Sequence, residues 1–152
     1  MPDQPGQHRS IPLVRELVRT YQAFEQLSSQ RIKQHGLTHA QFDVIATLGN
    51  TPGMSCRELS ERTLITKGTL TGVLDRLLDK GLISRTVPEH DRRSLFVALT
   101  PAGEAVFDSA FPDVVSHCGE AFAHLDDASL NQHIAMLAAL RAAIGQKLEP
   151  AE

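Results

Sequence analysis

The sequence predicts a mainly α-helical fold with a small β-hairpin, in which a helix–turn–helix is followed directly by a wing. Three observations predict it. Ser55 and Glu58 have the spacing of a capping box, which opens a short helix. A second helix ends at Gly81, since glycine readily adopts the left-handed conformation that terminates helices. Two runs of strand-forming residues, 82–87 and 95–99, then flank a charged loop.

The second of these helices, which Thr66 caps, has two distinct faces. One is an apolar stripe at helical spacing, formed by Leu70, Val73, Leu74, Leu77 and Leu78. The other holds mainly small or hydrogen-bonding side chains: Lys67, Gly68, Thr69, Thr71, Gly72, Asp75 and Arg76. Small side chains allow close approach to base edges, and a helix N-terminus favours phosphate. An ordinary solvated face is the alternative, and the wing that follows makes DNA recognition the better interpretation.

The loop between the two strands carries Asp91, Arg92 and Arg93. An arginine at the tip of a wing can enter a minor groove, where narrow DNA concentrates negative potential. Asp91 repels phosphate, so its expected role is to orient an arginine through a hydrogen-bonded ion pair. A solvated turn of mixed charge is the alternative.

These two features together predict the DNA contacts. The residues expected to approach or read the major groove are Lys67, Thr69, Thr71 and Arg76. Arg92 and Arg93 are expected to anchor the wing, with Asp91 as the orienting residue.

Long helices are predicted on both sides of this lobe, which spans 38–99. The first covers 11–34, and its apolar face consists of Val14, Leu17, Val18, Tyr21 and Phe24. Thr38 caps the next helix, and residues 101–146 supply two more, the first capped by Thr100 and the last beginning at Asp126 or Asp127.

A small winged lobe offers too little surface to bury these terminal helices. They predict a symmetric homodimer, in which two recognition helices about 34 Å apart meet successive major grooves. A helical cap on a monomer is the alternative.

Composition agrees with one domain over residues 1–152. The chain has a net charge of −3, yet residues 55–99 hold eight Lys or Arg against six Asp or Glu and so carry +2. Local positive charge is what a groove contact needs. No apolar run approaches the roughly twenty residues that span a bilayer, and residues 1–9 lack the apolar core of a signal peptide, so a cytoplasmic protein without a membrane partner is expected. Cys56 and Cys118 form no disulfide framework.

The segment from Leu37 to Phe107 resembles the MarR family of winged-helix transcriptional regulators. The matching residues are Leu37-Thr38 with Gln41-Phe42, Leu59, Thr66-Lys67-Gly68-Thr69-Leu70-Thr71 leading to Leu74, Leu77 with Lys80-Gly81-Leu82-Ile83, Asp91-Arg92-Arg93-Ser94, and Leu99-Thr100-Pro101-Ala102-Gly103. Asp91 and Arg93 fall on the wing motif of the family. The order of helices also fits, so the resemblance covers nearly the whole chain.

The resemblance implies a cytoplasmic homodimer that binds a pseudo-palindromic operator and usually represses. Many family members release DNA when a small aromatic or phenolic effector binds between the dimer helices and the DNA-binding lobe. Arg15, Tyr21, His35 and His39 are the candidate polar contacts of such a pocket.

The sequence also bears on enzymatic, protein-binding, redox-responsive and metal-responsive functions. The sequence has no Gly-rich phosphate loop, nucleophile elbow or metal-ligand cluster, so no enzyme, cofactor or metal is predicted. A winged-helix module that binds protein is one alternative. A redox-responsive or metal-responsive regulator is another, because Cys56 opens a helix, where a thiol pKa can fall, and His35, His39, His117 and Cys118 are ligand types that zinc accepts.

Overall fold

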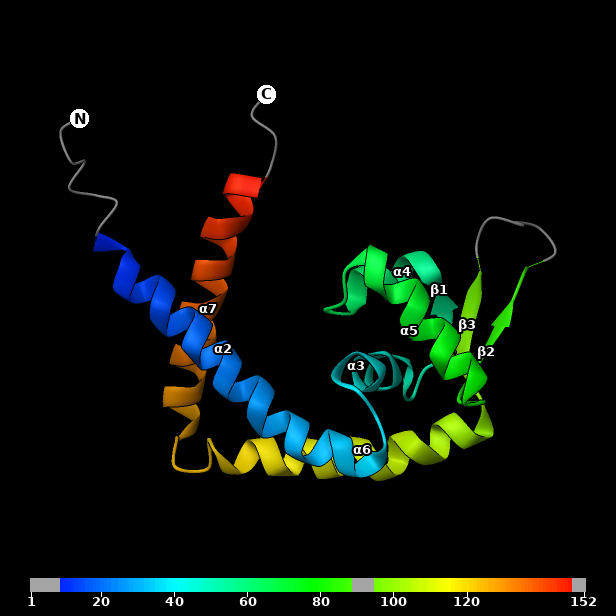
Figure 1. The fold of residues 1–152 in the computed structure, drawn as a ribbon. Coiled ribbons are helices and arrows are strands. Elements are labelled where there is room, and N and C mark those ends of the chain that lie inside the picture. Colours follow the sequence, from blue (N-terminus) through cyan, green and yellow to red (C-terminus); the bar gives the residue numbers. More distant parts are fainter. Residues whose placement is uncertain (1–8, 89–94, 149–152) are drawn as a thin grey trace. The chain divides into compact units, whose positions relative to one another are not determined.

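A computed structural model describes residues 9–88 and 95–148 of the protein. The chain divides into two compact units, with the boundary between Cys118 and Gly119. The first unit combines helices with a small antiparallel sheet (Figure 1), which confirms the predicted fold class.

The elements follow the order that the sequence predicts, with one additional strand. In the first unit they are α2 (Ile11–Ile32), the single 3-10 turn η1 (Lys33–His35), α3 (His39–Leu48), β1 (Met54–Ser55), α4 (Cys56–Arg62), α5 (Lys67–Asp79), β2 (Ile83–Thr86), β3 (Phe96–Leu99) and α6 (Pro101–Glu120), which extends two residues past the boundary. The second unit contains α7 (Asp127–Leu148).

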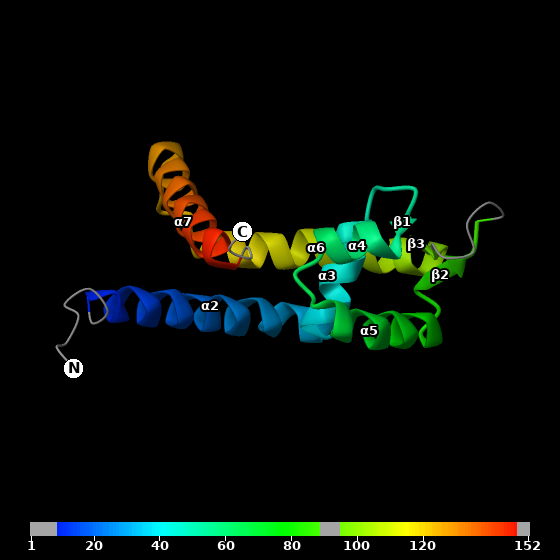
Figure 2. The same cartoon turned by 90° about the horizontal axis from the view of Figure 1, so that it is seen from above.

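The sheet has three strands in the order β1-β3-β2, all antiparallel. The hairpin of β2 and β3 is the predicted wing, and it lies beside the C-terminal end of α5 in Figure 1 and Figure 2. Strand β1 is not among the predicted elements, because a strand of two residues shows no alternation of apolar and polar side chains. Ser55 pairs with Phe96 in the sheet and is also the residue that caps α4.

Side-chain caps begin most of the helices where the sequence places them. Thr38 and Gln41 form a complete capping box on α3, and the Thr100 hydroxyl accepts the Gly103 N–H at 3.1 Å. Ser55 accepts the Glu58 N–H at 3.1 Å, while the Glu58 carboxylate pairs with Arg62 at 2.8 Å. The predicted box at Ser55 is therefore only half formed among the described residues.

Thr66 occupies the N-cap position of α5 as predicted, but its side chain does not cap the helix backbone. Its hydroxyl instead lies 3.1 Å from the Thr69 hydroxyl. Gly81 follows the helix with a φ of +71°, which confirms the predicted stop.

The core of the first unit lies between α3, α5, the sheet and α6. Its fully buried side chains include Ile32, Val44, Ile45, Leu48, Leu59, Leu77 and Val97. Close packing extends to the backbone, because a Cβ at Gly49 would overlap the Phe107 ring. This core anchors α5 by its apolar stripe and leaves its other face uncovered.

The terminal helices bury little of their apolar surface. Of the predicted face of α2, Val14, Val18 and Tyr21 are each about half exposed or more, and α7 has no buried residue within its described length. No helix in the described ranges is both long enough and apolar enough to span a bilayer.

Candidate nucleic-acid interface

The polar face of α5 is open to solvent along its length. Leu70, Val73, Leu74 and Leu77 point into the core. The four predicted major-groove residues, Lys67, Thr69, Thr71 and Arg76, are all exposed on this one helix. The structure therefore brings them together as the sequence analysis requires.

Two glycines, Gly68 and Gly72, leave the same helix without side chains at these positions. A Cβ built at Gly68 or Gly72 meets no heavy atom within 4 Å, so both positions face open space. The backbone of α5 can thus approach a flat partner, such as the edges of base pairs in a major groove, more closely than a helix of larger residues.

The wing of β2 and β3 follows α5 directly, but Asp91, Arg92 and Arg93 lie outside the described residues. Their roles at the wing tip stay predictions.

An ion pair that the sequence analysis missed joins the wing to α5. Arg85 on β2 donates to Asp75 on α5, with 2.9 Å between Nη2 and Oδ1. The Arg85 Nε is buried and has no hydrogen-bond partner among the described residues. A signal for this pair existed, because the two-residue period of a strand places Arg85 on the same side as the buried Ile83.

A concavity of about 380 Å³ lies where α4, α5 and the sheet meet. Its lining residues are Cys56, Arg57, Ser60, Lys67, Leu70, Thr71, Leu74, Arg85 and Leu95. Three of these residues are cationic, but Arg57 pairs with Glu61 at 3.4 Å and Arg85 pairs with Asp75 at 2.9 Å. Lys67 lies in the first turn of α5, where the helix dipole also favours an anionic group such as a phosphate.

The pKa values of the two cysteines bear on the redox-responsive alternative. Burial raises the pKa of the Cys56 thiol, although the charge of Arg85 partly opposes the effect. Burial raises the pKa of Cys118 as well. The lowering of a thiol pKa that a helix N-terminus can produce is therefore opposed at Cys56, because the loss of hydration has the larger effect. Neither shift is in the direction that activates a cysteine.

The four candidate effector residues do not gather in one place. Arg15 and Tyr21 are exposed on α2, eleven or more residues before its end. His39 shares a hydrogen bond of 2.6 Å with the buried Ser28 hydroxyl. His39 also lines an open concavity of about 460 Å³ together with Gln22, Glu25, Gln26, Ser29, Gln30 and Lys33.

His35 instead connects η1 to α6. Its Nε2 lies 2.8 Å from the Asp113 carboxylate, and Arg31 lies 3.9 Å from the other carboxylate oxygen. The hydrogen bond with His35 lowers the pKa of Asp113 against a smaller effect of burial, and Arg31 and His117 lower it further.

The histidines that were weighed as zinc ligands thus contact polar side chains of this chain, and His117 lies 3.3 Å from the Gln30 amide oxygen. In the described ranges, no group of three or more His, Cys, Asp or Glu side chains is arranged to hold a metal ion.

Comparison with known proteins gives consistent matches. The MarR family model matches residues 35–94, which include α3, α4, α5 and β2 but not β3. The homoprotocatechuate degradative operon repressor of Escherichia coli is 35% identical over 79 residues, 52% of this chain and 53% of that protein. The matched region therefore spans about half the length of that relative.

Two solved structures resemble the fold over nearly all of it. Bordetella bronchiseptica BpsR, whose DNA binding is regulated by 6-hydroxynicotinic acid, has a TM-score of 0.72 and 29% identity, covering 87% of this chain and 98% of that one. A mutant of Escherichia coli MarR complexed with operator DNA has a TM-score of 0.78 and 26% identity, covering 87% and 95%.

Proposed function

We propose that the chain is a member of the MarR family, a sequence-specific DNA-binding transcriptional regulator that works as a cytoplasmic homodimer. The observation that carries the proposal is the exposed polar face of α5, which lies in a helix–turn–helix and is followed by a wing. The matched relatives support the same function: one is named a repressor, one has its DNA binding regulated, and one is complexed with operator DNA.

In this proposal α5 is the recognition helix. Lys67 in its first turn contacts phosphate, while Thr69 and Thr71 approach base edges between the two glycines. Arg76 lies nearer the other end of the helix and has the donors for a bidentate contact with guanine. Arg92 and Arg93 anchor the wing, and Asp91 orients them.

The homodimer rests on the uncovered apolar surface of the terminal helices. Val14 and Val18 on α2, and Ile134 and Leu137 on α7, are each about half exposed or more. Exposed apolar surface of this extent is typical of an interaction site. A twofold interface would place the two α5 helices at the spacing of successive major grooves.

We further propose that a small aromatic or phenolic acid controls DNA binding. Two relatives support this: the BpsR structure names 6-hydroxynicotinic acid, and the Escherichia coli relative is named for homoprotocatechuate degradation. Arg15 and Tyr21 are available to such an effector, whereas His35 and His39 would have to exchange the hydrogen bonds they already make. The effector would shift the population of dimers toward a spacing that no longer fits the operator.

A fluorescence-anisotropy titration tests the proposed function. The duplex comes from the region upstream of the gene for this protein, a scrambled duplex is the control, and the titration is repeated at several salt concentrations. We expect tight binding that is selective and falls steeply with salt, since phosphate contacts release counterions. Equal, weak binding to that duplex, to its scrambled control and to the best duplexes selected from a random library would contradict the proposal and favour a protein partner.

A further inference from the structure

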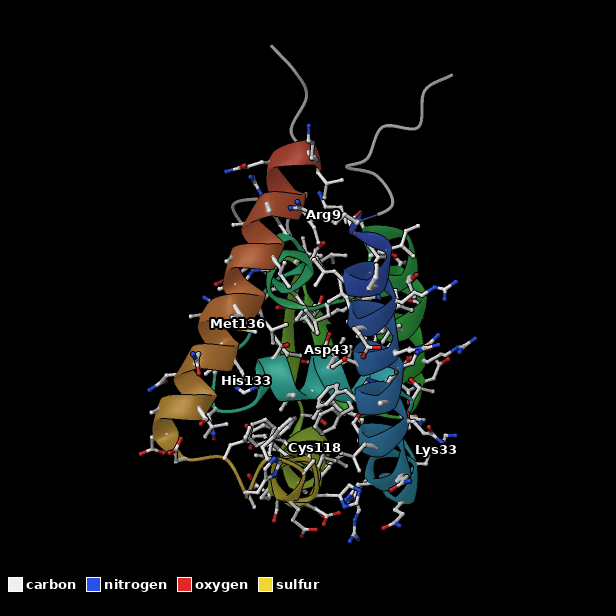
Figure 3. All side chains as sticks on the ribbon, turned by 90° about the vertical axis from the view of Figure 1, so that its left-hand side faces the viewer. Arg9, Lys33, Asp43, Cys118, His133 and Met136 are labelled. Carbon is white, nitrogen blue, oxygen red and sulfur yellow. The ribbon has the colours of Figure 1, made fainter. Side chains whose placement is uncertain are left out.

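Hydrogen bonds connect both ends of α5 to α3 or to Gly36, which precedes α3. At the first end, the Asp43 carboxylate on α3 accepts the backbone N–H of Leu64 at 2.7 Å. Figure 3 labels Asp43 on this helix. Leu64 lies in the turn between α4 and α5, so the bond joins α3 to the segment that sets the start of α5.

The turn between α4 and α5 is also held by burial, because Thr63 is buried and Ile65 packs against the core. The Thr63 N–H completes α4 by donating to the Leu59 carbonyl, and α5 begins after Thr66. The Leu64 side chain between these two residues is 92% exposed. At Leu64 the backbone bond to Asp43 therefore adds a directional restraint that packing of this side chain does not supply.

At the other end, Lys80 follows the last turn of α5. Its Nζ donates to the Gly36 carbonyl at 2.9 Å and to the Gln41 side-chain oxygen at 3.2 Å. Gln41 is buried, and the same oxygen accepts the Thr38 N–H in the capping box of α3. Lys80 thus connects the end of α5 to the first turn of α3.

Between these two points the helices share an apolar core. Val44, Ile45 and Leu48 of α3 are buried in the same cluster as the stripe of α5. Apolar packing is not directional, so by itself it allows small rolls and tilts of a helix. The directional bonds of Asp43 and Lys80, at opposite ends of α5, restrict that freedom. Base recognition needs this restriction because the edges of bases are read at hydrogen-bond distances.

We propose that Asp43 and Lys80 are positioning residues, which fix the orientation of α5 for base recognition and do not themselves contact DNA. The inference rests on the proposed function. Asp43 provides the sharpest test, because its charge and its hydrogen bond have opposite effects on DNA binding. Loss of a negative charge on this lobe should tighten binding to DNA, whereas loss of the tether should weaken specific binding.

The first experiment compares Asp43→Ala with Asp43→Asn, which remove the same charge. Asparagine retains a side-chain oxygen that can accept the Leu64 N–H, and alanine does not. The probe is the best duplex that the full-length protein selects from a random library. We expect Asp43→Ala to weaken binding to that duplex about tenfold. Asp43→Asn should bind at least half as tightly as the unsubstituted protein, and binding of both variants to a scrambled duplex should not weaken.

The second experiment compares Lys80→Met with Lys33→Met. Lys33 is exposed in η1, and the described structure gives its side chain no hydrogen bond or ion pair, so it controls for the loss of one positive charge. We expect Lys80→Met to weaken specific binding several-fold with an unchanged salt slope. A slope that falls by about one would mean that Lys80 contacts phosphate, and it would overturn its positioning role.

Thermal unfolding of each variant separates positioning from global loss of structure. Weaker specific binding at an unchanged unfolding temperature supports the inference, as does rescue by Asp43→Asn where Asp43→Ala unfolds early. Variants that all bind the selected duplex like the unsubstituted protein would overturn the inference and leave the proposed function intact. Failure of the unsubstituted protein to select any duplex would overturn both.

Discussion

Two helices of this protein, α5 and α7, both carry apolar residues at helical spacing but differ in how these residues are buried. In α5 the stripe of Leu70, Val73, Leu74 and Leu77 is buried within the first unit. In α7 the corresponding residues Ile134, Leu137 and Ile144 are 51–63% exposed. The difference shows that apolar spacing along a helix does not by itself say which surface covers it. The winged lobe completes its own core, whereas the apolar residues of α7 are assigned to the proposed dimer interface.

The largest expected effect compares one leucine from each helix. Leu77→Ala removes a fully buried side chain and should lower the free energy of unfolding by about 2–5 kcal/mol. Leu137→Ala removes a side chain that is 56% exposed, so it should change the unfolding of the lobe by less than about 0.5 kcal/mol. Denaturant titration measures both, and sedimentation should show that only Leu137→Ala weakens the dimer. Equal destabilisation by both substitutions would contradict the contrast.

The next comparison uses two glycines of the lobe. Gly49→Ala places a methyl group against the Phe107 ring and should destabilise the fold by about 1–3 kcal/mol. Gly72→Ala meets open space on α5, so it should stabilise the helix by up to about 1 kcal/mol. The same Gly72→Ala variant should bind operator DNA more weakly, since the added methyl group lies on the face proposed to enter the groove. Unfolding and anisotropy titrations on the two variants check both signs.

The wing gives a prediction about binding alone. Arg93→Ala should weaken operator binding by about 1–3 kcal/mol and leave the dimer intact, because the substitution changes no residue of the terminal helices. Arg19→Ala is the matched control, since Arg19 is exposed on α2 and, among the residues that the structure describes, pairs only with the nearby Glu16. Unchanged operator affinity for Arg93→Ala would show that this side chain does not touch DNA.

The smallest expected effect concerns Asp113, which connects η1 to α6 through His35. Because the pKa of Asp113 is lowered in the folded protein, its contribution to stability is present above the ordinary carboxyl value of 3.8 and is lost as pH falls through the folded-state value. The unsubstituted protein should therefore unfold at a slightly higher temperature than Asp113→Asn at neutral pH. The difference should disappear on acidification. A constant difference across this range would show that the carboxylate charge is not responsible.

The sequence predicted the helices well because their signals are local. The caps at Thr38, Ser55 and Thr100, the stop at Gly81 and the stripe of α5 depend on residues within a few positions of one another. The exposed face with Lys67, Thr69, Thr71 and Arg76 follows from the same periodicity. The DNA contacts of these residues, and those of the wing tip, stay predictions.

What the sequence could not predict depends on distant partners. Strand β1 exists because Met54 and Ser55 pair with β3, and neither has a local pattern of its own. A helix start can lower a thiol pKa, but burial, a property of the packed lobe, raises the pKa of Cys56. The four candidate effector residues were grouped by resemblance, and two of them proved to be engaged with Ser28 and Asp113.

The sequence by itself determined where the helices of the winged lobe begin, that α5 stops before Gly81 and which face of α5 is polar, because backbone capping and helical periodicity act over a few residues. Only the tertiary structure decided how α5 is held. The bonds of Asp43 to Leu64, Arg85 to Asp75 and Lys80 to Gly36 join residues that are 10 to 44 positions apart. Such pairs are set by the packing of the core, which brings their atoms within hydrogen-bond distance.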